Sequence, residues 1–217
     1  MSRKSVAVLI SGRGSNMAAL IEAAKDKNYP AEIALVVSNR PDAGGLHVAR
    51  AAGIATAVVG HAAFGKDRAA FERALQAVLT NHHIDLVCLA GFMRLLTPGF
   101  VGLWPERMLN IHPALLPAFK GLDTHQRALE AGVKVHGATV HFVVPEMDSG
   151  PIIAQGAVAV HAGDTEEKLS ARVLDVEHRI YPLALSLVAQ GRVRVVGGRC
   201  LIDGVPVPDS ASIVPSA

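Results

Sequence analysis

Apolar runs alternate with amphipathic stretches through the first half of the chain. Val6–Ile10 is a continuous apolar run, which is typical of a strand covered on both faces. Four more strands are expected at Ala34–Ser38, Ala55–Val59, Asp85–Ala90 and Met108–Ile111. Helical spacing falls between them, at Met17–Ala24, Gly44–Ala52 and Lys66–Leu79. In the last of these, Arg68, Glu72 and Arg73 fall mostly off the apolar face. This alternation predicts an α/β fold with a doubly wound, mostly parallel sheet and right-handed crossovers.

The second half has a different pattern. A proline-rich loop, Pro113–Gly121, precedes a helix at Thr124–Ala131, two strands at Gly137–Val144 and Ile152–Val160, and a long helix at Thr165–Ala189. A hairpin is expected near Val193–Leu201. No linker or repeat divides the chain, so we predict a single domain over residues 1–200 and a disordered Pro/Ser-rich tail over 201–217.

Composition narrows the possible partners. Half of the 217 residues are apolar, which suits one domain with a substantial core. The formal net charge of +2 comes without a long basic run, so nucleic acid is not favoured, although a pI near 8.7 suits a phosphorylated small molecule. Arg94 and Pro98 interrupt the best candidate for a membrane span. The start resembles no complete signal peptide, and Cys88 fits a buried hydrophobe, so we expect a cytoplasmic chain without a membrane.

A glycine-rich loop, Ser11–Asn16, lies between the first strand and the first helix. This order leaves backbone N–H groups free at a helix start, where anions bind. The dinucleotide fingerprint is incomplete, because its third glycine would fall at Met17 and no acidic residue ends the second strand. No lysine follows as in a Walker loop. What remains is a cradle for one phosphate, or an ordinary turn capped by Ser15.

Asn110 and His112 occupy alternate positions at the end of the fifth expected strand, so they project from the same side. Pro113 ends the strand and favours extended geometry at His112. An amide beside an imidazole can bind a carbonyl oxygen and move a proton, as acyl transfer to an amine requires. The alternative is a buried strand in which both side chains satisfy backbone groups.

Four motifs occur in the order and spacing of one known family: Ser11-Gly12-x-Gly14-Ser15-Asn16, Ala90-Gly91-Phe92-Met93-Arg94, Asn110-Ile111-His112-Pro113-x-Leu115-Leu116-Pro117 and Asp148-x-Gly150. Over residues 5 to about 190 the chain resembles the phosphoribosylglycinamide formyltransferase family of folate-dependent formyltransferases. The resemblance implies the formyltransferase fold, with a Rossmann-like nucleotide-binding half at 1–105 and a folate-binding and catalytic half at 106–200. It also implies transfer of a formyl group from 10-formyltetrahydrofolate, as co-substrate, to the amine of glycinamide ribonucleotide in purine synthesis.

The resemblance also implies residue roles. Asn110, His112 and Asp148 correspond to the catalytic trio, and Asn110 also to a folate contact. Gly14, Ser15, Asn16 and Glu177 correspond to the nucleotide site. The folate site corresponds to Arg68 and to the segment Met93, Arg94, Leu95 and Leu96. Three of these residues have a specific structural alternative: Glu177 and Arg68 as surface residues, and Asp148 as a turn residue.

The implied mechanism is direct attack by the amine, with Asn110 and protonated His112 donating to the formyl oxygen. Asp148 would stabilise the imidazolium. No metal is expected, because the ten histidines lack ligand spacing, and His141 is expected beside the site. The chain departs from the usual pattern at Arg13, at Ala114 and at Lys120, the last of which bears on loop closure.

Four rival functions are considered beside this one. A methionyl-tRNA formyltransferase would need an RNA-binding domain beyond this length, and a formyltetrahydrofolate hydrolase would usually add an N-terminal domain and has no need of a phosphate cradle. A non-catalytic nucleotide-binding module is disfavoured by the complete trio. A NAD-dependent oxidoreductase ranks last. The partners expected are small-molecule substrates, and the sequence leaves monomer or homodimer open.

Overall fold

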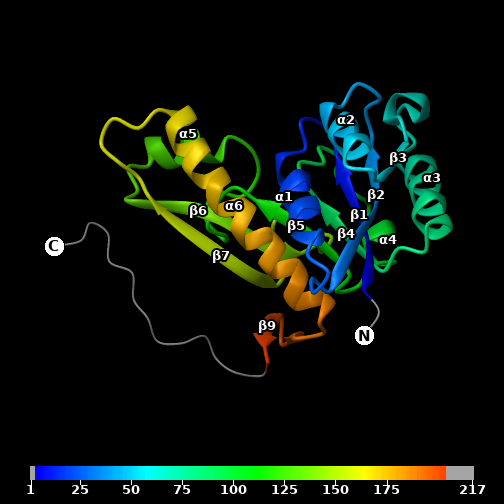
Figure 1. The fold of residues 1–217 in the computed structure, drawn as a ribbon. Coiled ribbons are helices and arrows are strands. Elements are labelled where there is room, and N and C mark those ends of the chain that lie inside the picture. Colours follow the sequence, from blue (N-terminus) through cyan, green and yellow to red (C-terminus); the bar gives the residue numbers. More distant parts are fainter. Residues whose placement is uncertain (1–2, 204–217) are drawn as a thin grey trace. The chain divides into compact units, whose positions relative to one another are not determined.

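A computed structural model describes residues 3–203 of the chain (Figure 1). Its main sheet has seven strands in the order β3-β2-β1-β4-β5-β6-β7. The strands are β1 Lys4–Ile10, β2 Ala31–Ser38, β3 Ala55–Val58, β4 Leu86–Leu89, β5 Met108–His112, β6 Val135–Phe142 and β7 Ile152–Ala159, with a separate hairpin of β8 Val193–Val196 and β9 Arg199–Ile202. The helices are α1 Ser15–Ala24, α2 Gly44–Ala51, α3 Arg68–Asn81, α4 Pro98–Val101, α5 Thr124–Glu130 and α6 Glu166–Ala189, with a 3-10 turn, η1, at His61–Phe64.

The residues group into two compact units. Within residues 3–203, unit 1 runs to Asn110 and includes Val143–Pro145, and unit 2 comprises Ile111–Phe142 and the residues from Glu146. In unit 1, β1 pairs in parallel with both β2 and β4, β2 with β3, and β4 with β5. The predicted α/β class with a mostly parallel sheet is confirmed.

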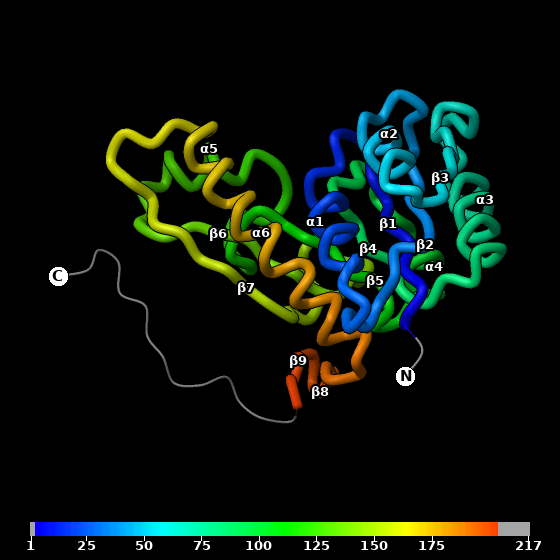
Figure 2. Tube along the Cα trace, viewed as in Figure 1, coloured from blue at the N-terminus to red at the C-terminus, as the bar shows by residue number. Residues whose placement is uncertain are grey.

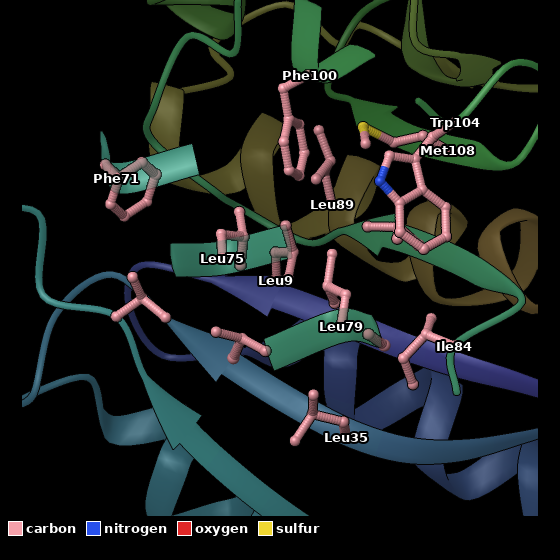
Figure 3. Packing of buried hydrophobic residues seen from close by; sticks show 14 residues of the cluster. Leu9, Leu35, Phe71, Leu75, Leu79, Ile84, Leu89, Phe100, Trp104 and Met108 are labelled. Carbon is pink, nitrogen blue, oxygen red and sulfur yellow. The ribbon is translucent and has the colours of Figure 1, made fainter. Parts of the chain in front are cut away.

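Helices cover both faces of the sheet in unit 1. The side chains of β1 alternate, so that Leu9 joins a buried cluster with Leu75 and Leu79 of α3 (Figure 3). Ile10 points to the opposite face, where its side chain lies against Gly45 of α2. Burial on both faces explains why β1 is apolar at every position from Val6 to Ile10.

Unit 2 is built on an antiparallel pair, in which β6 runs against β7. The long helix α6 packs along both strands, as the chain trace shows (Figure 2). Thr165 caps α6 by accepting a hydrogen bond from the Lys168 amide, and Glu166 and Glu167 follow in the first turn, where acidic side chains are favourable. Here the chain alternates hairpin and helix instead of repeating the crossovers of unit 1.

Most predicted elements are confirmed within a few residues, with three corrections. Glu72, predicted to lie off the apolar face of α3, is buried because its carboxylate accepts hydrogen bonds from Thr97. The short helix α4 was not predicted, since four residues give no periodicity. Strand β9 runs to Ile202, past the predicted start of the tail at 201, and most of that tail lies outside the described residues. None of the helices in the described part is long and apolar enough to cross a membrane.

Candidate active site

The glycine-rich loop of unit 1 opens into a pocket of about 550 Å³. Gly14 precedes α1 with a left-handed φ of 76°, and a Cβ there would lie 3.1 Å from the Cα of Gly45. Glycine adopts the left-handed φ without strain, and it has no Cβ to crowd Gly45. The tight turn therefore depends on glycine at this position. The turn brings the first residues of α1, Ser15 and Asn16, into the pocket wall. No side chain caps α1, which excludes the predicted alternative of a turn capped by Ser15.

The pocket is lined by cationic and polar side chains. Arg13, Arg40 and Arg94 contribute to its wall, together with Asn39 and His61. Arg40 is engaged with Asp42 at 2.9 Å. Over residues 3–203, Arg13 and Arg94 take part in no ion pair. A wall that combines an open helix N-terminus with two unneutralised arginines suits a phosphate.

The segment after β4 also belongs to unit 1. Met93 and Arg94 line the same pocket as the glycine loop, as expected from the carboxyl ends of neighbouring parallel strands. The Met93 and Leu95 side chains are exposed, at 69% and 61%. Arg68, at the start of α3, is exposed too. These residues are therefore available to a ligand, whereas their structural alternative as plain surface residues stays open.

In unit 2, His112 and Asp148 lie together. The Nδ1 atom of His112 is 3.5 Å from Oδ2 of Asp148, and its Nε2 atom lies 3.0 Å from the carbonyl oxygen of Phe119, to which it donates. Both side chains are nearly enclosed, with 7% and 11% of their areas exposed. Each ring nitrogen thus faces an oxygen acceptor, which is the arrangement that a ring with a proton on both nitrogens needs.

Local backbone geometry aims Asp148 at the ring. Its φ is 49°, and its Oδ2 atom accepts a hydrogen bond of 2.9 Å from the Gly121 amide. Gly150, two residues later, approaches β6 so closely that a Cβ would overlap with the carbonyl oxygen of Phe142. The spacing Asp148-x-Gly150 is therefore required by packing: glycine lets the turn approach the strand, and the turn presents the carboxylate.

Three more histidines surround this pair. His141 Nε2 lies 3.9 Å from Oδ1 of Asp148, and burial lowers the pKa of His141. The His136 ring packs edge-to-face against Phe119 and against His125, with ring centroids 5.7 and 5.4 Å apart. Burial, followed by the like charge of His125, lowers the pKa of His136 to about 4. Burial also lowers the pKa of His125.

The burial and contacts of three candidate residues bear on whether each is only structural. Glu177 on α6 is only 7% exposed, so it is not a surface residue. Asn110 is half-buried and precedes His112 by two residues on β5, as the alternation predicts. The alternative in which Asp148 is only a turn residue leaves its contacts with His112 and Gly121 unexplained.

Unit 1 has a loop-built anion pocket and unit 2 has a buried histidine–carboxylate pair, two features that group-transfer enzymes use. The sequence pattern of the formyl transferase family matches residues 4–185. The chain therefore belongs to the formyl transferase family. It is 47% identical to phosphoribosylglycinamide formyltransferase of Escherichia coli, over 94% of this chain and 95% of the relative. It is 53% identical to the trifunctional purine biosynthetic protein adenosine-3 of Bos taurus over 88% of this chain, which spans only 19% of that longer relative.

Solved structures with a similar fold belong to the same family. The crystal structure of glycinamide ribonucleotide transformylase 1 from Symbiobacterium toebii superposes with a TM-score of 0.89 and 48% identity, covering 92% of this chain and 94% of that one. The predicted resemblance to this family is confirmed.

Sequence reasoning missed several residues that shape the site. Ser11 directly follows β1 and Asn39 directly follows β2. A polar residue just after a buried strand was the available signal for a position at the site. Phe119 contributes its carbonyl group, which every residue has, so no side-chain pattern identifies it. In the described part of the chain, no three His, Cys, Asp or Glu side chains form a group suited to a metal ion.

Proposed function

We propose that this chain transfers the formyl group of 10-formyltetrahydrofolate to the amine of glycinamide ribonucleotide, a step of purine synthesis. The observation that carries the proposal is the enclosed His112–Asp148 pair, in a chain 47% identical over nearly its full length to a relative named for this reaction. The activity needs only small-molecule substrates and would place the chain in the cytoplasm.

In the proposed mechanism, the neutral amine attacks the formyl carbon and negative charge develops on the formyl oxygen. Collapse of this tetrahedral intermediate breaks the bond between the formyl carbon and the folate nitrogen. That nitrogen leaves as tetrahydrofolate after receiving the proton that the amine loses, which Asp148 helps to pass. His112 donates a proton or hydrogen bond to that oxygen as general acid. The Asp148 carboxylate, 3.5 Å from Nδ1, compensates the positive charge of the ring. The Nε2 proton is held by the Phe119 carbonyl, so the formyl oxygen must replace that carbonyl to receive it.

Asn110 supplies the second donor to the formyl oxygen in this proposal. It lies two positions before His112 on β5, and in an extended strand that places both side chains on one side. Pre-aimed donors of this type are each worth about 10²–10³-fold in rate. No covalent intermediate with the enzyme is required.

The two substrates would use different groups. We assign the 5′-phosphate to the N–H groups of Gly14, Ser15 and Asn16, which line the cationic pocket, and a further nucleotide contact to Glu177. We assign the folate to Arg68, to the backbone of Met93, Arg94, Leu95 and Leu96, and to Asn110. An exposed backbone edge can pair with the donors and acceptors of a pterin ring.

Release of tetrahydrofolate, followed by absorbance with and without glycinamide ribonucleotide, tests this function. Release that requires the ribonucleotide supports the transferase, with formylated ribonucleotide as the second product. Release without the ribonucleotide would instead identify a formyltetrahydrofolate hydrolase. Binding of the ribonucleotide without any turnover would leave a non-catalytic nucleotide-binding module. The variant His47→Gln, on the exposed face of α2, serves as a matched histidine control for His112→Ala.

A further inference from the structure

The hydroxyl group of Ser11 joins the two binding segments of unit 1. Ser11 follows β1 and begins the glycine loop, and it is only 7% exposed. Its backbone N–H donates to the Gly91 carbonyl at 3.1 Å, and its Oγ atom accepts from the Met93 amide at 2.8 Å. The first residue of the phosphate loop therefore holds the first residue of the proposed folate segment.

Asn39 fixes the direction of this hydroxyl. The Oγ atom of Ser11 lies 2.6 Å from Oδ1 of Asn39, whose side chain is buried. Because the Met93 amide can only donate, the single hydroxyl proton of Ser11 must go to Asn39. His61 packs against Asn39: its Nδ1 atom lies 3.1 Å from the Asn39 amide nitrogen and 2.9 Å from the Asn39 backbone carbonyl oxygen. Two hydrogen bonds in series, which we call the relay, thus connect Met93 to Ser11 and Ser11 to Asn39, each donated in that direction.

The other end of the folate segment is held in the same way. The buried carboxylate of Glu72 accepts from the Thr97 amide at 2.6 Å and from the Thr97 hydroxyl. Between these two anchors, within residues 3–203, the backbone groups of Arg94, Leu95 and Leu96 form no hydrogen bonds to the chain. The segment is therefore fixed at both ends, with its backbone edge left available to a ligand.

We propose that Ser11 and Asn39 are positioning residues that hold this backbone edge for the folate and couple it to occupation of the phosphate loop. The inference rests on the proposed roles of the two segments. A phosphate bound to the N–H groups after Gly14 orders the loop that begins at Ser11, and the relay passes that order to Met93. By linkage, each ligand then tightens the other by the same factor.

Calorimetry with tetrahydrofolate and glycinamide ribonucleotide tests this coupling, because these two molecules bind without reacting. In Ser11→Ala, the Kd for tetrahydrofolate alone should rise about five- to tenfold, the effect of losing one buried hydrogen bond. The Kd for the ribonucleotide alone should change less than about twofold. The factor by which saturating ribonucleotide tightens tetrahydrofolate should fall toward one.

Two further variants separate positioning from general damage. Ser38→Ala removes an equally buried hydroxyl at the end of β2, bonded only to the backbone of Arg40, and should leave the Kd for tetrahydrofolate and the coupling factor as in the unmodified chain. Asn39→Ala should weaken tetrahydrofolate in the same way as Ser11→Ala, and the double variant should be no worse than either.

Three results would overturn the inference: equal weakening of both ligands, no change in tetrahydrofolate binding, or a coupling factor of one in the unmodified chain. These results are distinct from failure of the proposed function, which would appear as absent turnover. The binding measurements remain decisive in that case, because they do not depend on the reaction.

Discussion

The two units present their candidate functional groups in opposite ways. In unit 1, the glycine loop offers backbone N–H groups in an open pocket, and arginines line its wall. In unit 2, the working groups are side chains, and His112 and Asp148 are almost fully enclosed. The first arrangement is suited to recognising charge and shape, while the second is suited to holding a proton at a defined position.

This difference predicts different sensitivities. A backbone site depends on conformation, so only substitutions that alter φ or close approach damage it. A buried side-chain site depends on particular atoms, and removing one leaves its partner desolvated and unpaired. Burial also links unit 2 to pH, because it lowers the pKa of His125, His136 and His141.

The largest effect is expected at the His112–Asp148 pair. His112→Ala should lower kcat by about 10³-fold and Asp148→Asn by about 10²-fold, because one removes the proton donor and the other the charge that supports it. The double variant should resemble His112→Ala alone, since both residues act as one unit. Steady-state kinetics with both substrates saturating measures this.

A multiplicative loss in the double variant would contradict this expectation, because it would mean that Asp148 acts independently of His112. The KM for glycinamide ribonucleotide provides the contrast with unit 1. It should change less than about threefold in all three variants, as the phosphate loop is untouched.

The next largest effect is a loss of folding stability at acidic pH, caused by His136. The pKa of His136 is about 4 in the folded protein, below the ordinary value of 6.5. The unfolded chain therefore binds this proton more readily, so the contribution is fully present above pH 6.5 and is lost as pH falls toward 4. The free energy of unfolding should drop by up to about 3 kcal/mol over that window from this group.

Urea unfolding at several pH values measures this slope. His136→Leu should flatten it, and His47→Gln on the surface of α2 should not. An unchanged slope in His136→Leu would show that other groups, such as His125, carry the acid sensitivity of unit 2.

The glycine loop should respond to conformation. Gly14→Ala places a Cβ at φ 76° and 3.1 Å from Gly45, so the KM for the ribonucleotide should rise about tenfold as the turn shifts. Gly44→Ala is the matched control, because nothing lies within 4 Å of its added Cβ and its φ is ordinary. Equal effects of both substitutions would remove the conformational argument.

The sequence predicted the parts of this protein that depend on repeating patterns. Apolar strand-like runs located the five strands β1 to β5. The signal is strongest in β1, whose residues from Val6 to Ile10 are all buried, and weaker in the edge strand β3, which is partly exposed. The alternation of Asn110 and His112 on β5 was visible because strand periodicity is local. Asp148 and Glu177 came from the family resemblance, and their residue roles stay predictions.

The remaining features depend on contacts between distant residues. The burial of Glu72 follows from Thr97, which lies 25 residues away in sequence, and helical periodicity alone assigned it to the surface. The Ser11–Met93 bond joins residues 82 apart. The requirement for glycine at 150 appears only once the turn meets the Phe142 carbonyl. Such contacts leave no periodic signal in either segment.

The smallest effect is expected at Lys120, where the chain departs from the usual family pattern. Its Nζ atom donates to the Ser149 hydroxyl at 2.6 Å, joining the loop that carries Phe119 to the turn that carries Asp148. Lys120 and Ser149 are exposed, so this bond contributes little stability. Lys120→Met should change kcat less than about twofold and the free energy of unfolding by less than about 0.5 kcal/mol. A larger fall in kcat at unchanged stability would mean that the surface contact, and not only the Gly121–Asp148 hydrogen bond beneath it, holds the carboxylate against His112.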